Sequence, residues 1–256
     1  MPGRRFSDVR RLTTVDSTNR YLLDEARAGA ADGVVAVADH QTAGRGRRGR
    51  RWDAPPGSNL LVSVLLRPRL PAARRPLAGT AVALAVADAV ADRLGVALGL
   101  KWPNDLLAPD GRKVAGVLAE TDMGGPAGAA VVVGVGINVN WPAADDIIPP
   151  ELVGTATSLR DQLGRPVDRE GLLSAVLDAL EVRAAELDTE PGRARLGEES
   201  ARRCTTLGAS VRVELTDGAV CGTAISLTPE GHLVVAGDGG TRTVVAGDVI
   251  HLRPGP

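Results

Sequence analysis

The sequence predicts an α+β protein, with a mixed β-sheet domain, helices packed on the sheet, and a small C-terminal β-barrel. Over most of the chain, apolar strand-like runs alternate with helical stretches. After Leu207 the pattern changes to short strands at regular spacing, separated by turn signals. A chain of 256 residues is long enough for one large domain with its own core and a smaller second one. We therefore expect a first domain over residues 1–204 and a barrel over residues 205–256.

Three helices are expected in the first domain. The first begins at a cap formed by Asp16 or Ser17. The second is rich in alanine and valine, begins at Pro76 and ends at Gly95. An amphipathic pattern predicts the third over residues 167–187.

Short apolar runs predict the strands of both domains. A glycine-rich segment, residues 124–128, predicts a turn between the last two strands of the first domain. The strands of the first domain are expected at residues 34–38, 60–66, 96–101, 114–120 and 129–135. Those of the barrel are expected at residues 211–215, 219–226, 232–236 and 241–245.

Composition excludes several classes of protein. Hydrophobic residues make up 44% and charged residues 24%, which is typical of a globular chain and not of a disordered one. The formal net charge is -1, whereas dedicated nucleic-acid-binding domains carry a clear positive excess. The longest apolar stretch, residues 77–100, contains Asp88, Asp92 and Arg93, so it does not suit a membrane span. We expect neither a nucleic-acid nor a membrane partner.

The cysteines and the N-terminal segment indicate a cytoplasmic protein. Cys204 and Cys221 are too few for a disulfide framework, although one bridge between them remains an alternative. The N-terminal segment lacks the apolar stretch of a secretory signal. A reduced, cytoplasmic setting is therefore expected.

The segment Gln41-Thr-Ala-Gly-Arg-Gly-Arg-Arg-Gly-Arg-Arg-Trp52 is the most informative part of the sequence. Its glycines, Gly44, Gly46 and Gly49, alternate with arginines. Glycine lets a backbone approach a ligand closely, and guanidinium groups bind phosphate and carboxylate oxygens, so the pattern is typical of an anion site. It is not a Walker A loop, because no Gly-Lys-Ser/Thr follows. The alternative is a solvated basic loop or a nucleic-acid patch.

Two further segments carry side chains suited to a nucleotide site. In Lys101-Trp-Pro-Asn-Asp105, the oxygens of Asn104 and Asp105 suit Mg²⁺ held beside a phosphate, although Pro-Asn-Asp is also ordinary turn chemistry. In Gly134-Val-Gly-Ile-Asn138, the final amide can pair with a base edge or simply cap a turn.

Lysine is rare in this chain, which has only Lys101 and Lys113. Lys113 lies at the start of an expected strand, where a lysine is commonly a solvated flank whose stem covers apolar surface. Its rarity, and the space that Gly116 leaves beside the strand, favour a binding role instead.

Several motifs occur together and in a fixed order: Ser17-Thr-Asn19, Gln41-Thr-Ala-Gly-Arg-Gly-Arg47, Trp52, Lys101-Trp-Pro-Asn-Asp105, Lys113-Val-Ala-Gly116, Gly134-Val-Gly-Ile-Asn138 and Ala156-Thr-Ser-Leu159. Each motif alone is weak, but the set resembles that of the biotin–protein ligases, the biotin–[acetyl-CoA-carboxylase] ligases of bacteria. The resemblance is close over residues 13–159, and the C-terminal barrel also resembles the family's C-terminal domain.

The resemblance implies a fold and an activity. The fold is the mixed-sheet catalytic domain of the biotin/lipoate ligases, which is similar to that of class II synthetases. The activity is the ATP- and Mg²⁺-dependent conversion of biotin to biotinyl-5'-AMP. Biotin is then transferred to a specific lysine on the biotin carboxyl carrier domain of acetyl-CoA carboxylase or a related carboxylase.

The family's functional residues carry over to matching positions of this sequence. The resemblance implies that Lys113 and Arg45 are catalytic and that Asp105 helps to place the metal. It implies biotin contacts for Ser17, Thr18, Asn19, Gln41, Gly44, Arg45, Gly46, Arg47, Lys113, Gly116, Gly134 and Gly136. It implies ATP contacts for Arg47, Arg50, Trp52, Asn104, Lys113 and Asn138.

The start of this sequence departs from the pattern of some family members. Some members begin with a DNA-binding helix-turn-helix, whereas here Asp16-Ser-Thr-Asn19 comes almost at once. We therefore expect the monofunctional form, acting as a monomer or weak homodimer, with residues 44–51 closing over the adenylate. One alternative is a lipoate or related acyl-protein ligase, which shares the adenylate chemistry. The other is a non-catalytic nucleic-acid-binding module that uses the arginine loop.

Overall fold

A computed structural model describes residues 4–124, 128–143, 146–216 and 218–252 and contains two β-sheets. The larger sheet has seven strands in the order β1-β2-β3-β7-β6-β5-β4. β1 and β2 pair in parallel and the other neighbours are antiparallel, so the sheet is mixed, as expected. Its strands are β1 (Val9–Val15), β2 (Val35–Gln41), β3 (Leu60–Leu66), β4 (Gly99–Lys101), β5 (Asp105–Leu107), β6 (Lys113–Asp122) and β7 (Ala130–Ile137).

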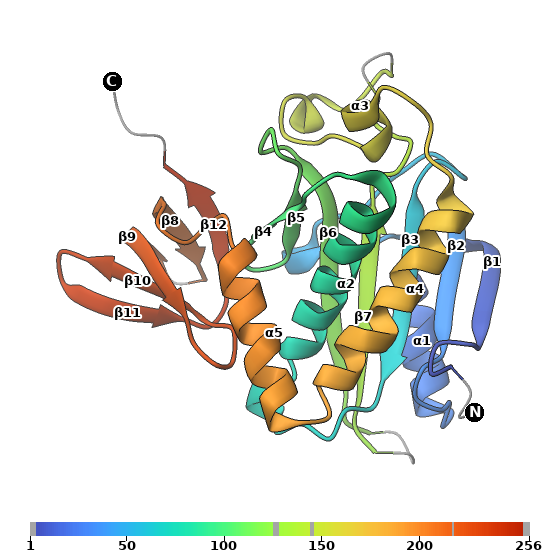
Figure 1. The fold of residues 1–256 in the computed structure, drawn as a ribbon, viewed down its shortest axis with the longest axis horizontal. Coiled ribbons are helices and arrows are strands. Elements are labelled where there is room, and N and C mark those ends of the chain that lie inside the picture. The colour runs from blue at the N-terminus through green and yellow to red at the C-terminus, as the bar shows by residue number, and fades with distance from the viewer. Residues whose placement is uncertain (1–3, 125–127, 144–145, 217, 253–256) are drawn as a thin grey trace.

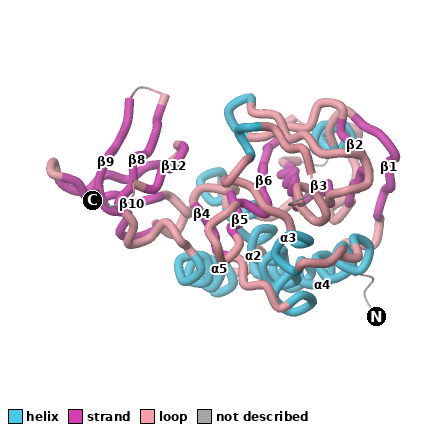
Figure 2. Tube along the Cα trace, turned by 90° about the horizontal axis from the view of Figure 1, so that it is seen from above, coloured by secondary structure: helices cyan, strands magenta, loops and turns pink. Residues whose placement is uncertain are grey.

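Helices cover both faces of this sheet (Figure 1 and Figure 2). Successive side chains of a strand point to opposite faces. Thus Val35 and Val37 pack in the core with α2 and α4, whereas Ala36 packs with α1. The interior strand β3 is buried at every residue, as expected for a strand covered on both sides. The helices are α1 (Thr18–Arg27), α2 (Leu77–Leu94), α3 (Leu159–Leu163), α4 (Arg169–Glu186) and α5 (Glu190–Arg203).

The ends of the helices follow capping chemistry. Ser17 occupies the N-cap of α1 with an extended backbone, and its hydroxyl makes no cap hydrogen bond. Gly95 ends α2 in the left-handed region, with φ of 70°, a conformation that glycine adopts at low cost. The side chains of Asp168 and Thr189 each accept a hydrogen bond from a backbone N–H in the first turn of α4 and α5.

The C-terminal strands form a five-stranded antiparallel sheet in the order β11-β10-β9-β8-β12, consistent with the expected fold class. The sheet lies beside α5 and β4 (Figure 2). Its core consists mainly of valines and leucines, and Trp102 reaches into it from the first domain. The boundary proposed between residues 204 and 205 falls in the connection between α5 and β8. The strands are β8 (Ser210–Leu215), β9 (Gly218–Leu227), β10 (Leu233–Gly237), β11 (Gly240–Val244) and β12 (Asp248–His251).

Several elements were not expected from the sequence: β1, β5, β12, α3 and α5. β1 carries Arg10 and Arg11 among its few apolar residues, so its alternation is weak. The strand expected at residues 96–101 is confined to β4. Within the expected turn at 124–128, residues 125–127 lie outside the described part of the chain.

Two expectations from composition can be compared with the structure. Among the described residues, no helix is both long and apolar enough to cross a lipid bilayer. Cys204 and Cys221 are both free, so the alternative of a bridge between them is wrong.

Candidate functional site

The glycine- and arginine-rich segment after β2 folds back on itself. The N–H of Gly46 donates to the carbonyl of Arg50 (2.7 Å), and that of Trp52 donates to the carbonyl of Gly44 (3.0 Å). The backbone of Arg48 lies in the left-handed region, with φ of 54°. This folded segment, residues 44–51, is called the arginine loop below. It returns the chain to the large sheet at Trp52.

A small pocket lies where the arginine loop meets the sheet. Gly116 of β6 and Gly136 of β7 face each other in register at its floor. A methyl group on Gly136 would overlap the Trp52 indole, so the glycines make room for that ring. The cavity that remains is about 30 Å³. Its lining residues are Ser17, Thr18, Asn19, Gln41, Arg45, Trp52, Val62, Gly116, Leu118, Gly134, Val135 and Gly136.

The polar side of this pocket is built by the start of α1. The side-chain oxygen Oε1 of Gln41 accepts hydrogen bonds from both the backbone N–H and the hydroxyl of Thr18, at 2.8 and 3.0 Å. The Ser63 hydroxyl lies 2.7 Å from Thr18 Oγ1 and from Asn19 Oδ1. Asn19 Nδ2 donates to Glu120 Oε2 (2.9 Å). These bonds fix Thr18 and Asn19 in orientation.

Three polar groups of the pocket make no hydrogen bond within the described part of the chain. Among the described residues, neither the Ser17 hydroxyl nor Gln41 Nε2 makes a hydrogen bond. Trp52 Nε1 is buried, and it too has no partner in the described part of the chain. Unpaired donors in a small pocket are groups that a polar ligand could satisfy.

Lys113 lies next to this pocket and reaches the arginine loop's return segment. Its Nζ is 2.6 Å from Asp105 Oδ1 and 5.5 Å from the centre of the Trp52 ring. A Cβ on Gly116 would stand 3.1 Å from Lys113 Nζ, so the glycine leaves space for the ammonium group. The structure therefore brings Lys113, Trp52 and Asp105 together from three separate segments.

The loop's arginines point to different partners. Arg45 pairs with Glu120 of β6, with 3.1 Å between NH2 and Oε1. Arg47 donates from NH1 to the carbonyl of Gly247 (3.1 Å) and to Asn104 Oδ1 (3.5 Å). Burial lowers the pKa of Arg47, while the carboxylate of Asp248 acts in the opposite direction.

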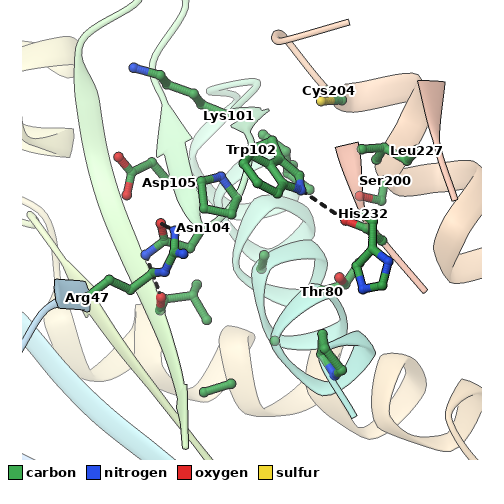
Figure 3. Close-up of a pocket in the computed structure, with 18 of the residues that line it drawn as sticks. Arg47, Thr80, Lys101, Trp102, Asn104, Asp105, Ser200, Cys204, Leu227 and His232 are labelled. Carbon is green, nitrogen blue, oxygen red and sulfur yellow. Dashed lines mark hydrogen bonds between the residues drawn. The ribbon is translucent and has the colours of Figure 1, made fainter. Parts of the chain in front are cut away.

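A larger cavity of about 240 Å³ lies between the two domains, and Arg47, Asn104 and Asp105 stand at one side of it (Figure 3). Trp102 lies at its centre, with its indole N–H donating to the carbonyl of Gly231 (2.9 Å). Other residues of this cavity could not be predicted from the sequence, because each comes from a segment without a motif. Among these are Thr80 of α2, Ser200 of α5 and His232 of the C-terminal domain.

Asn138 lies apart from the small pocket's lining. Its side chain is buried, with Oδ1 accepting from Asn59 Nδ2 (3.3 Å) and Nδ2 donating to the carbonyl of Thr157 (3.0 Å). Its amide is therefore committed within the protein, and base pairing by Asn138 stays a prediction. Roles for Ser63, Glu120 and Asn59 could not be predicted from the sequence, because a lone polar residue in or next to a strand gives no spacing signal.

Metal binding by protein groups alone has no support. Among the described residues, no cluster of three or more His, Cys, Asp or Glu side chains could hold a metal ion. Asp105 is ion-paired to Lys113, and the Asn104 amide donates to the carbonyl of Val117 (2.7 Å). Mg²⁺ usually takes only one or two protein carboxylates and completes its shell with phosphate oxygens and water. Asp105 fits that limited role.

Both parts of this chain are similar to known proteins. Residues 12–138 match the Biotin/lipoate A/B protein ligase family, and residues 206–252 match the Biotin protein ligase C terminal domain. The biotin–[acetyl-CoA-carboxylase] ligase of Mycobacterium tuberculosis is 41% identical over 93% of this chain and 86% of its own length. The ligase of the same name from Paracoccus denitrificans is 33% identical over 93% of this chain and 98% of its own.

A solved structure shares the whole architecture. The biotin protein ligase of Aquifex aeolicus, in complex with biotin and ATP, superposes with a TM-score of 0.81 and 28% identity. The match covers 97% of this chain and all of that one. Both domains described above are therefore included in the similarity.

Proposed function

Because this chain belongs to the biotin protein ligase family, we propose that it activates biotin with ATP and transfers the biotinyl group to a lysine of a carrier protein. The observation that supports this most is the meeting of Lys113 with the return segment of the arginine loop, beside a pocket with unpaired polar groups. These groups come from distant parts of the sequence and converge where a carboxylate could meet a nucleotide.

The chemistry requires such a cluster of cations. A carboxylate oxygen of biotin attacks the α-phosphorus of ATP, the bond to the β-phosphate breaks, and pyrophosphate leaves. Two like unit charges about 4 Å apart repel by about 4 kcal/mol at an effective dielectric near 20. Lys113 and Arg45 would offset this repulsion at the reacting groups, and Arg47 and Arg50 would bind the outer phosphates. Preorganised positive groups of this kind are usually a large part of catalysis.

The polar rim of the small pocket supports recognition of biotin's ureido group. Gln41 Nε2 and the Ser17 hydroxyl are uncommitted donors, and Thr18 and Asn19 are held by a shared network. The glycines Gly116, Gly134 and Gly136 line this region, Gly44 lies beside Gln41, and Gly46 lies further out in the loop, next to Arg50. A site that hydrogen-bonds a polar ring strongly rejects analogues without one, because its own groups would be left unpaired. This favours biotin over lipoate, whose ring lacks a ureido group.

The nucleotide side would involve the Lys101-Trp-Pro-Asn-Asp105 segment. Mg²⁺ is proposed to accompany ATP, with Asp105 as its protein carboxylate and Asn104 beside it. The ion would neutralise phosphate charge when bound. Trp52 and Asn138 are proposed to contact the nucleotide.

The second step transfers the acyl group. The neutral amine of an acceptor lysine attacks the carbonyl of the mixed anhydride, an amide forms, and AMP leaves. We propose as acceptor a biotin carboxyl carrier domain of acetyl-CoA carboxylase or a related carboxylase, in the cytoplasm where ATP and such carboxylases occur. We further propose that the chain acts as a monomer or weak homodimer without a nucleic-acid partner.

The direct test mixes the protein with ATP, Mg²⁺ and biotin and looks for biotinyl-5'-AMP by mass spectrometry, with lipoate in a parallel reaction. Adenylate from biotin, followed by labelling of a purified carrier domain, is the expected result. Adenylate from lipoate alone would assign the chain to the related acyl ligases. Tight nucleic-acid binding with a steep salt dependence and no adenylate would favour the non-catalytic alternative.

A further inference from the structure

The C-terminal domain contacts the arginine loop through one carboxylate. Asp248, the first residue of β12, pairs with Arg50 at 2.8 Å, with Arg48 at 3.6 Å and with Arg47 at 3.9 Å. The neighbouring carbonyl of Gly247 also accepts a hydrogen bond from Arg47 (3.1 Å). The middle of the arginine loop and the start of β12 are thus joined, although they lie far apart in the sequence.

This arrangement has an electrostatic reason. Arg47, Arg48 and Arg50 place like charges within a short turn, and Asp248 lies within ion-pair distance of each. The Asp248 side chain is 29% exposed and that of Arg47 is 19% exposed, so both are partly shielded from water. One shared carboxylate reduces the repulsion among the guanidinium groups and holds them together on one side of the loop.

The same domain also holds the segment Lys101-Trp-Pro-Asn-Asp105, which is proposed to lie on the nucleotide side. Trp102 packs in the C-terminal core, and its backbone N–H donates to the buried hydroxyl of Thr206 (3.1 Å). Two residues further along the chain, Asn104 lies within 3.5 Å of Arg47. In contrast, the small pocket is lined only by residues of the first domain. A contact made by the C-terminal domain should therefore influence the nucleotide side and not the biotin side.

We infer that Asp248 is a positioning residue for ATP: through it, the C-terminal domain holds the arginine loop in the form that binds the outer phosphates. The inference rests on the proposed function, because that function assigns Arg47 and Arg50 to the nucleotide. Asp248 itself does not touch the reacting atoms. Replacing Asp248 leaves the proposed phosphate ligands Arg47 and Arg50 in the chain, but it removes the ion pairs that hold them together.

The test compares Asp248→Asn with the wild type and with Asp238→Asn, which removes the same charge from an exposed turn of the same domain. Trypsin cleavage within the loop, mapped by mass spectrometry without any ligand, reports loop order directly. Biotin-dependent exchange between pyrophosphate and ATP gives kcat and the KM for each substrate. Thermal unfolding checks that the variants fold. Asp248→Glu tests whether a carboxylate at this place restores the behaviour.

For Asp248→Asn, we expect cleavage after Arg47 to Arg51 to be several-fold faster. The KM for ATP should rise about tenfold, equivalent to about 1.4 kcal/mol, with kcat and the KM for biotin nearly unchanged. Asp248→Glu should recover part of the loss, and Asp238→Asn should match the wild type. Unchanged cleavage would overturn the inference, as would equal effects on both substrates. A lower KM for ATP would also overturn it, because Asp248 would then compete with phosphate. If the wild type forms no adenylate, the proposed function fails, while the cleavage assay still decides whether Asp248 orders the loop.

Discussion

Lys113 and Asp105 form an ion pair between the neighbouring strands β6 and β5 of the large sheet, with Nζ 2.6 Å from Oδ1. Both side chains are partly exposed, so the pair is accessible to ligands. An incoming carboxylate and phosphate would offer Lys113 new partners, and Asp105 would then be free to face a cation. The pair thus places one positive and one negative side chain beside the site of the proposed reaction.

Replacing Lys113 with methionine should abolish most of the adenylation rate. Methionine keeps the length and apolar stem of lysine but removes the charge, and loss of one preorganised stabilising group typically costs about 10²–10³ in rate. Biotin binding should change less, because only the proposed contact to the carboxylate is lost and Lys113 does not line the small pocket proposed for the ring. Single-turnover formation of biotinyl-5'-AMP measures the first quantity, and calorimetry the second.

Arg165→Met is the control, since it removes a positive charge from the exposed turn after α3 and lines neither cavity. If Lys113→Met retained the wild-type rate, Lys113 could not be the proposed catalytic cation.

Trp52 should have to move when biotin binds. The small pocket holds only about 30 Å³ beside the indole, room for about two water molecules, and Trp52 Nε1 is buried without a partner in the described structure. Adding biotin should therefore change the emission of Trp52. The measurement is the difference in fluorescence between the wild type and Trp52→Phe, with and without biotin. An identical response in both proteins would show that Trp52 stays in place.

Much of the fold could be predicted because its strands are either buried on both faces or regularly alternating. β3 is an uninterrupted apolar run, and its expected and observed bounds agree. β1 was missed because Arg10 and Arg11 interrupt its pattern, and its position depends on parallel pairing with β2. α5 was missed because it contains two glycines, a proline and few apolar residues, so its place is determined by packing against α2.

The candidate site could be predicted only as a set of motifs, because distances between them depend on the sheet. Spacing alone could not show that Glu120 bridges Asn19 and Arg45, which requires β6 to pass beside α1. It also could not show that Trp102 belongs to the C-terminal core, because that contact joins two domains. Both sets of contacts depend on long-range packing, which the local sequence pattern does not specify.

Gly134→Ala should weaken biotin binding. A methyl group there would overlap Asn19 Oδ1 and stand 3.1 Å from the Ser63 hydroxyl, so the network at the pocket's polar side would have to shift. Overpacking of this kind typically costs about 1–3 kcal/mol of stability. The binding constant for biotin and the urea midpoint would show both effects.

Gly197→Ala provides the comparison, because position 197 lies within α5 and no atom lies near an added Cβ. Alanine at position 197 should raise the free energy of unfolding of the protein by about 0.5–1 kcal/mol, because alanine has a higher helix propensity than glycine. Equal behaviour of the two variants would contradict the assigned role of Gly134.

Arg45→Gly should release the adenylate prematurely. Arg45 ties the arginine loop to β6 through Glu120 at 3.1 Å, so its loss should loosen the cover over the reactive intermediate. We expect free biotinyl-5'-AMP to accumulate and lysines of an unrelated protein, such as serum albumin, to be labelled. Arg51→Ala, whose exposed guanidinium pairs with nearby Asp53, is the control. Retention of the intermediate and unchanged selectivity in Arg45→Gly would count against a covering role for the loop.

His251 should make the stability of the domain junction depend on pH. Its Nε2 lies 3.2 Å from the hydroxyl of Thr206, which also accepts the N–H of Trp102. Burial lowers the pKa of His251 below its usual 6.5, and the positive charge of Lys101 acts in the same direction. The unfolded chain therefore binds more protons than the folded one just below that value, so stability should be full above about pH 6.5 and decrease as the pH falls.

The free energy of unfolding in urea, measured at about pH 7.5 and about pH 5.5, tests this. The decrease between the two pH values should be smaller in His251→Gln than in the wild type, because glutamine cannot be protonated there. His232→Gln, at a histidine that faces the interdomain cavity instead, is the matched control for the removal of one histidine. The comparison uses differences between pH values within each protein, so any constant loss from the altered bond to Thr206 cancels. An equal decrease in His251→Gln and the wild type would mean that other groups set the pH response, such as the carboxylates ion-paired to arginine.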